Sequence, residues 1–200
     1  AKALVLNAIP TEKDFHNLHS AILSLQENIQ GAALSLSRPE VKEPPKEFIS
    51  LEQLIDTHSI LLDKEASSWK EAIIAAGELL LWKRCITVNY LNSMLDLVSQ
   101  YGPYIVLTKG IALAHAAPTD GHLAPGFSMV RFKNPVIFDH EYHDPVSIVF
   151  SFTVPNVPAY TYTILEFMHM LRAPSFLKEM MRVKTPQEAL DYILSSFHMS

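Results

Sequence analysis

Residues 101–123 read YGPYIVLTKGIALAHAAPTDGHL, and this stretch decides the fold expected for the chain. An apolar run at 104–107 leads through a Lys-Gly pair into a second apolar run at 111–114, a pattern typical of β-strands. The second run ends at His115, and a Pro-Thr-Asp-Gly turn follows at 118–121. The sequence therefore predicts a histidine at the end of a strand, among small residues and in front of a tight turn.

Two interpretations of His115 follow from this local pattern. A lone histidine near a buried strand is often a structural residue whose ring is hydrogen bonded. A sterically open histidine is instead a nucleophile, because imidazole is largely unprotonated near neutral pH. The neighbouring residues alone leave both interpretations open.

Apolar spacing predicts the elements on either side of this segment. Strands are expected at 60–62, 105–112, 128–131 with 136–138, and 147–153, and helices at 51–55, 69–83, 88–100, 161–171, 176–182 and 186–197. One strand, two helices, three strands and three helices in this order predict an α/β protein. The expected architecture is a three-layer α/β/α sandwich with a small mixed sheet.

The first 47 residues are expected to form a separate part of the chain. Residues 1–34 read as one strand and one helix, which is too little to build a core alone. Residues 35–47 are a charged, proline-rich linker, so 48–200 is the main domain. Two interpretations of 1–34 stay open: the end of a preceding domain in a longer protein, or an extension that packs on the main domain.

Composition narrows the classes of function. The chain has 200 residues, 48% of them hydrophobic, and a net charge of −5. Without a basic run, direct nucleic-acid binding by this segment is not expected, and no apolar run is long enough for a membrane helix. The single cysteine, Cys85, falls inside a helical pattern as a buried thiol, which fits a reducing, cytoplasmic setting.

Residues 139–144, DHEYHD, are the rival candidate site, because two histidines and several acids could bind a metal. The spacing lacks the i, i+4 geometry of two ligands on one helix face, and no distant third ligand is evident. A solvated turn is therefore the expected structure, and no metal site is predicted.

Segment 101–123 resembles the active-site signature of enzyme IIA domains of the bacterial phosphoenolpyruvate-dependent sugar phosphotransferase system (PTS). The resemblance is to the ascorbate-type branch of the mannitol/fructose superfamily. The matching residues are Tyr101-Gly102-Pro103-Tyr104-Ile105-Val106, Gly110-Ile111-Ala112-Leu113, His115-Ala116, Pro118 and Asp120-Gly121. Segments 68–73, 86–90, 144–150 and 184–189 resemble further parts of the family in the same order, so the resemblance covers roughly residue 47 to the C-terminus.

The resemblance implies that His115 accepts a phosphoryl group from the carrier protein HPr. It implies reaction at Nε2, with Nδ1 held by a backbone carbonyl, and no metal or organic cofactor. Two family positions differ here: the usual proline before the histidine is Ala114, and the usual arginine after it is Ala117.

The helper residues of the family also differ in this chain. Tyr160 stands where a helper histidine is common, and Asn156 where an aspartate is common. Tyrosine donates a hydrogen bond to a phosphate but supplies no positive charge. Backbone N–H groups at 114–117 are further candidate donors. His122 is close enough in sequence to substitute for the helper, although a solvated loop histidine is the expected structure.

Three functions are compatible with this resemblance. The first is a regulatory module of a sugar-responsive transcription regulator or antiterminator, in which residues 1–34 resemble the end of an enzyme IIB-like domain. The second is a stand-alone transport enzyme IIA that passes the phosphoryl group to a cysteine of an enzyme IIB. The third is a domain that has lost phosphorylation and only binds partners. The changes at Ala117 and Tyr160 favour the first.

Overall fold

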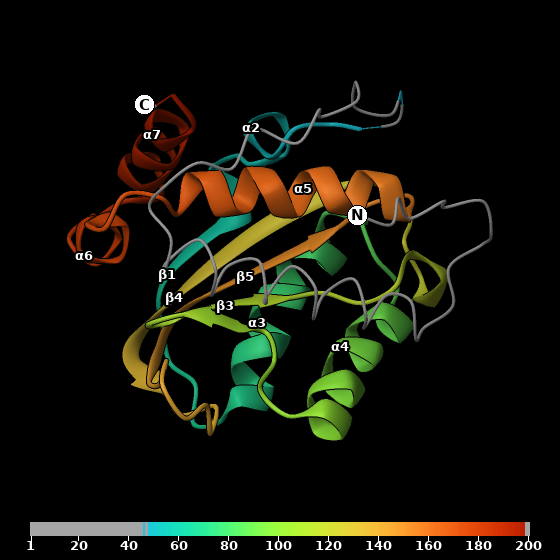
Figure 1. The fold of residues 1–200 in the computed structure, drawn as a ribbon, viewed down its shortest axis with the longest axis horizontal. Coiled ribbons are helices and arrows are strands. Elements are labelled where there is room, and N and C mark those ends of the chain that lie inside the picture. Colours follow the sequence, from blue (N-terminus) through green and yellow to red (C-terminus); the bar gives the residue numbers. More distant parts are fainter. Residues whose placement is uncertain (1–45, 47, 199–200) are drawn as a thin grey trace, which may run out of the picture. The chain divides into compact units, whose positions relative to one another are not determined.

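The structure, a computed structural model, describes Lys46 and residues 48–198 (Figure 1). These residues belong to one unit of the chain, Pro45–Ser200. The predicted strand and helix at 1–34 and the predicted linker at 35–47, apart from Lys46, lie outside the described residues. Both therefore stay predictions.

A mixed sheet forms the middle layer, with the strand order β1-β4-β5-β3-β2. The strands are β1 (Ile60–Lys64), β2 (Val106–Thr108), β3 (Ile111–Ala114), β4 (Gly126–Val136) and β5 (Val146–Thr153). β1 runs parallel to β4 and β3 parallel to β5, whereas the β4–β5 and β2–β3 pairs are antiparallel. The carboxyl ends of β3 and β5 consequently meet at one edge of the sheet.

Helices cover both faces of this sheet (Figure 1). One face carries α3 (Trp69–Trp82) and α4 (Val88–Tyr101). The other carries α2 (Leu51–Leu54), α5 (Val157–Met170), α6 (Phe176–Met180) and α7 (Pro186–Phe197). The predicted three-layer α/β/α fold is confirmed. None of the helices in the described part of the chain is long and apolar enough to span a membrane.

Polar side chains fix where the long helices begin. The N-cap residues of α3, α4, α5 and α7 each accept a hydrogen bond from a backbone N–H in the first turn. These residues are Ser68, Thr87, Asn156 and Thr185. Each cap satisfies an N–H that has no partner inside the helix, which is worth about 1 kcal/mol.

The core lies on both faces of the sheet. Toward α3 and α4 it consists of small and branched residues, among them Ala72, Ala76, Ala112, Ala114, Val130 and Val149. Toward α5 and α6 it is aromatic, and Phe150 packs against Phe127, Phe167 and Phe176 with ring centroids 5.1 to 6.4 Å apart. Burial of each such ring contributes about 1.5–3 kcal/mol.

Three predicted element boundaries were wrong. The single strand expected at 105–112 is a hairpin of β2 and β3, because Gly110 reverses the chain at φ +76°. The strand pieces expected at 128–131 and 136–138 are replaced by one longer strand, β4, which ends at Val136. The helix expected at 161–171 begins at residue 157, behind the N-cap Asn156.

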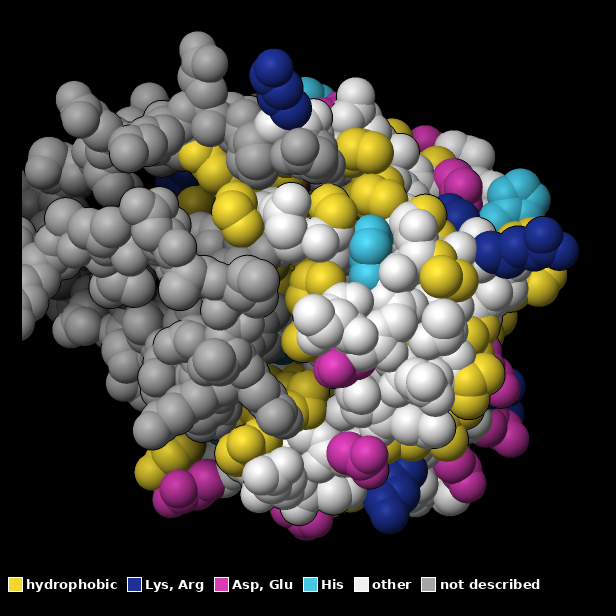
Figure 2. Space-filling view, turned by 90° about the vertical axis from the view of Figure 1, so that its right-hand side faces the viewer, with side chains coloured by type: hydrophobic (Ala, Val, Ile, Leu, Met, Phe, Trp, Pro, Cys, Tyr) yellow, Lys and Arg dark blue, Asp and Glu magenta, His cyan; other side chains and the backbone are white. Residues whose placement is uncertain are grey.

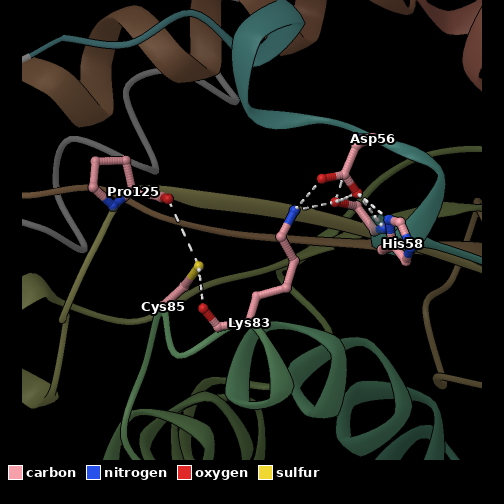
Figure 3. Close-up of polar contacts among 6 residues, drawn as sticks. Asp56, His58, Lys83, Cys85 and Pro125 are labelled. Atoms are coloured by element: carbon pink, nitrogen blue, oxygen red, sulfur yellow. Dashed lines mark hydrogen bonds and ion pairs between the residues drawn. The ribbon is translucent and has the colours of Figure 1, made fainter.

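Cys85 lies in the turn between α3 and α4 and not inside a helix, which corrects the sequence prediction (Figure 3). The thiol is buried, as expected, and its Sγ lies 3.7 Å from the carbonyl oxygens of Lys83 and Pro125. Burial raises its pKa, so Cys85 stays a protonated thiol at neutral pH. A structural role fits this environment.

Lys83, at the end of α3, contacts the short 3₁₀ helix η1 (Thr57–Ser59) that precedes β1 (Figure 3). Its Nζ donates to Asp56 Oδ2 at 3.0 Å and to Ser59 Oγ at 2.7 Å. Asp56 in turn caps η1 through the Ser59 N–H. The contact joins two segments that border the sheet.

Candidate functional site

His115 follows directly after β3, at the sheet edge where β3 and β5 end side by side. Side chains alternate between the two faces of a strand. Leu113 and His115 therefore share the face toward α5, and Ala114 and Ala116 share the face toward α4. The imidazole accordingly packs on Phe152 of β5, with ring centroids 5.6 Å apart.

One backbone contact sets the tautomer of His115. Its Nδ1 lies 3.0 Å from the carbonyl oxygen of Leu113, which can only accept a hydrogen bond. The proton of the neutral ring therefore sits on Nδ1, and the lone pair sits on Nε2. This is the arrangement that the resemblance implies.

Tyr160 meets the other ring nitrogen. Its hydroxyl lies 3.1 Å from His115 Nε2, and since Nε2 carries the lone pair, the phenol donates. Burial raises the pKa of Tyr160, so the hydroxyl keeps its proton. The structure thus brings the two residues singled out from the sequence into direct contact.

Aromatic rings hold the imidazole on its remaining sides. Tyr104 meets it edge-on at 6.0 Å and Tyr160 is tilted against it at 5.4 Å. Burial raises the pKa of Tyr104, so that phenol also stays neutral. His115 is 1% exposed, so its nucleophilic nitrogen lies beneath the surface and behind a tyrosine.

The peptide unit after His115 is held from the opposite face of the sheet. Tyr90 reaches over from α4, and its hydroxyl accepts the Ala116 N–H at 3.1 Å. The same hydroxyl lies 2.9 Å from the carbonyl oxygen of Ala116 and 3.0 Å from that of Phe152. The Ala116 N–H, one of the backbone donors considered from the sequence, therefore already has a partner.

Sequence reasoning missed Tyr90, Tyr104 and Phe152 as parts of the site. Tyr90 and Tyr104 fit the apolar spacing of their own elements, and Phe152 fits a buried strand. No local pattern distinguishes them from core residues, and only the fold brings them to His115.

The expectation that His122 is a solvated loop histidine was wrong. It is partly buried, and its Nδ1 lies 2.8 Å from Thr153 Oγ1. Burial lowers its pKa. Asn156 serves as the N-cap of α5 by accepting the Ala159 N–H at 2.9 Å, so its side chain oxygen is engaged in the fold.

The rival site at 139–144 is a turn, as predicted, built on its own hydrogen bonds. The carboxylate of Asp144 accepts the N–H groups of Phe138 and His140. Nδ1 of His140 accepts two further backbone N–H groups, and its ring stacks on that of His143 at 4.6 Å. Among the described residues no group of three potential metal ligands comes together.

The molecular face at the carboxyl ends of β3 and β5 is seen in Figure 2. Histidine atoms lie there between hydrophobic and uncharged atoms, whereas lysine and arginine atoms are found toward the margins of the view. Leu123 and Val88, which flank the turn after His115 and the start of α4, are 58% and 61% exposed.

Comparisons with known proteins agree with this geometry. Residues 53–196 match the family described as phosphoenolpyruvate-dependent sugar phosphotransferase system, EIIA 2. The ascorbate-specific PTS system EIIA component of Salmonella choleraesuis is 34% identical over 145 residues, which are 71% of this chain and 93% of that protein. Its counterpart in Escherichia coli K12 is 33% identical over the same lengths.

Solved structures show the same fold. A protein assigned as PTS IIA (PtxA) from Streptococcus mutans has 26% identity and a TM-score of 0.65, over 70% of this chain and 89% of that one. The mannitol-specific cryptic phosphotransferase enzyme IIA CmtB of Escherichia coli has 25% identity and a TM-score of 0.63, over 69% and 93%. The chain belongs to the EIIA 2 family of the phosphoenolpyruvate-dependent sugar phosphotransferase system.

Proposed function

We propose that Nε2 of His115 accepts a phosphoryl group from phospho-HPr. The observation that carries this proposal is the contact between His115 Nδ1 and the Leu113 carbonyl, because it leaves Nε2 as the nucleophilic nitrogen. Membership in the EIIA 2 family and the position of the histidine at a strand end support it.

In the proposed step, the Nε2 lone pair attacks phosphorus while the bond from phosphorus to the donor nitrogen breaks. The electron pair of that bond returns to the donor imidazole. The Nδ1 proton stays on the His115 ring and donates to Leu113, so the phosphorylated ring carries a positive charge. That charge offsets the negative oxygens of the phosphoryl group, which matters because Ala117 replaces the family arginine.

Tyr160 has two successive roles in this proposal. Before transfer its hydroxyl covers Nε2, and the phenol has to leave the nitrogen when the donor docks. After transfer the neutral phenol donates to a phosphoryl oxygen. A hydrogen bond to a charged group contributes about 1.5–3 kcal/mol.

The proposed acceptor of the phosphoryl group is a cysteine of an enzyme IIB, in the cytoplasm. The curated relatives reported above are named ascorbate-specific EIIA components, and this chain matches 93% of their length. Their names support a transport component, with ascorbate or a related small acid sugar as the transported substrate.

A second candidate is a regulatory module of a transcription regulator, whose output follows the phosphorylation of His115. The replacement of a family cation by Ala117 and of a helper histidine by Tyr160 favours this candidate, since both changes slow onward transfer. The two candidates differ in one observable, because a transport component has to pass its phosphoryl group from His115 to a IIB cysteine and a regulatory module does not.

Intact mass after incubation with phosphoenolpyruvate, enzyme I and HPr tests the proposal. We expect an acid-labile gain of one phosphoryl group in the wild type and none in His115→Ala. His58→Ala changes an exposed histidine outside the site, so it is the control and should still be labelled. A wild-type chain without any gain, or a labelled His115→Ala chain, contradicts the proposal.

A further inference from the structure

The two faces of the sheet carry different parts of the site. His115 and Phe152 face α5, whereas the next residue of each strand, Ala116 or Thr153, faces α4. Groups on the α4 side cannot touch a phosphoryl group on the imidazole. They act on the backbone that carries the ring.

Tyr90 is the residue on the α4 side whose side chain forms hydrogen bonds with this backbone. Tyr90 is 1% exposed. Its hydroxyl accepts the Ala116 N–H, and its single proton can be donated to the carbonyl oxygen of either Ala116 or Phe152. One phenol thus links the peptide after His115 to the residue on which the imidazole stacks. The tyrosine joins β3 and β5 beyond the last residue pair of their ladder, Ala114 and Ser151.

A second contact orients the phenol. Burial raises the pKa of Tyr90 to about 12, and a hydrogen bond from the Thr153 side chain opposes that rise. The Thr153 side chain therefore lies next to the Tyr90 hydroxyl. Thr153 Oγ1 also lies 2.8 Å from His122 Nδ1, so Thr153 lies between Tyr90 and His122.

Backbone contacts hold His122 and the residues beside it in place. His122 forms a β-bridge with Ile86, and the neighbouring Leu123 N–H donates to the Cys85 carbonyl at 2.8 Å. The Thr87 N–H donates to the Gly121 carbonyl at 2.9 Å. The segment from His115 to His122 is therefore held at both ends by the start of α4.

We propose that Tyr90 is a positioning residue for phosphoryl transfer at His115, oriented by Thr153 and His122. The inference rests on the proposed function. Phosphoryl transfer depends on alignment of nucleophile and phosphorus, and a displacement of about 1 Å costs about 100-fold in rate. Tyr90 holds the peptide that is one residue from the nucleophile, so it sets the direction of Nε2 without touching the substrate.

The test measures single-turnover transfer from phospho-HPr to the full chain in Tyr90→Phe, Thr153→Val and His122→Gln. We expect the maximal rate to fall about 10- to 100-fold in Tyr90→Phe, with an unchanged half-saturating concentration of phospho-HPr, because docking is not affected. Thr153→Val and His122→Gln should show smaller losses of the same kind. Tyr142→Phe, in an exposed turn, is the matched control and should equal the wild type.

Hydrogen exchange of the Ala116 amide gives a readout that does not depend on the reaction. Exchange should accelerate in Tyr90→Phe and, to a lesser extent, in Thr153→Val, and not in Tyr142→Phe. If Tyr90→Phe does not fold, Thr153→Val is the deciding variant, since it replaces a hydroxyl with a methyl group in a buried side chain of similar shape.

The outcomes separate this inference from the proposed function. A labelled wild type together with an unchanged maximal rate in the folded variants overturns the inference alone. A change in the half-saturating concentration without a change in maximal rate also overturns it, because it assigns Tyr90 to docking. A wild type that takes up no phosphoryl group overturns the proposed function, and the inference with it.

Discussion

The choice between the two nitrogens of His115 depends on one carbonyl group. Leu113 lies two residues before the histidine, and its oxygen reaches Nδ1 because the chain is still extended there. The family resemblance singled out His115 and Tyr160, and the structure brings their side chains within 3.1 Å of each other. Burial keeps the Tyr160 phenol protonated, so it meets Nε2 as a hydrogen-bond donor.

Tyr160→Phe should slow phosphoryl transfer about tenfold or more, since the variant loses a hydrogen bond to the phosphoryl group. The phosphohistidine should also hydrolyse faster than in the wild type. Both are measured by quenched-flow labelling with phospho-HPr and by following the decay of the labelled chain.

Tyr192→Phe is the control for Tyr160→Phe. Its hydroxyl is also buried, and it has no hydrogen-bond partner among the described residues. The control should behave as the wild type in both measurements. Transfer in Tyr160→Phe as fast as in the wild type would mean that the phenol only covers the nitrogen and takes no part in the reaction.

At the scale of elements, the sequence predicted the order of strands and helices better than their ends. The hairpin of β2 and β3 was missed because two apolar runs joined by a short link resemble one long strand. Gly110, whose φ of +76° suits no other residue well, was the signal. The helix expected at 161–171 begins four residues earlier, and Pro158 fits there because proline is well tolerated in the first turn of a helix.

The site shows the same limit of sequence reasoning. Its centre was predictable because a motif surrounds His115. Its support was not, because Tyr90 and Thr153 belong to elements whose apolar patterns only indicate burial. Their contacts arise when α4 packs on the sheet.

Glu166 of α5 gives a pH-dependent test of how α2 is attached. Its Oε2 accepts the Leu51 N–H at 2.7 Å. Burial raises its pKa, the Leu51 hydrogen bond opposes the rise, and the charge of Glu52 adds to it. Because the folded pKa lies above the unfolded value, this group's contribution to stability is full at acid pH. The contribution is lost as pH rises through the folded pKa.

Glu166→Gln keeps an acceptor for Leu51 and removes the titration. The free energy of unfolding of Glu166→Gln should therefore increase relative to that of the wild type as the pH rises from about 4 to about 7. Glu166→Ala removes the acceptor and should be about 1 kcal/mol less stable than Glu166→Gln at neutral pH. Urea unfolding across this range measures both. Parallel pH profiles for the wild type and Glu166→Gln would contradict the assignment.

At the scale of the whole described unit, four elements converge on one edge of the sheet. β3 brings His115, β5 brings Phe152 and Thr153, and the first turns of α4 and α5 bring Tyr90 and Tyr160. The N-terminal end of α5, a 14-residue helix, therefore lies at the edge where the phosphoryl group is proposed to bind. Its dipole is positive at that end, which favours an anion there.

The most direct test of the central claim locates phosphorus on the ring. The chain is labelled with ¹⁵N-histidine and phosphorylated through enzyme I and HPr, and the phosphorus–nitrogen couplings are recorded by NMR. The account predicts one coupling, to Nε2 of His115, with Nδ1 still carrying the proton that it donates to Leu113. A coupling to Nδ1 of His115, or to a ring nitrogen of His122, would contradict it.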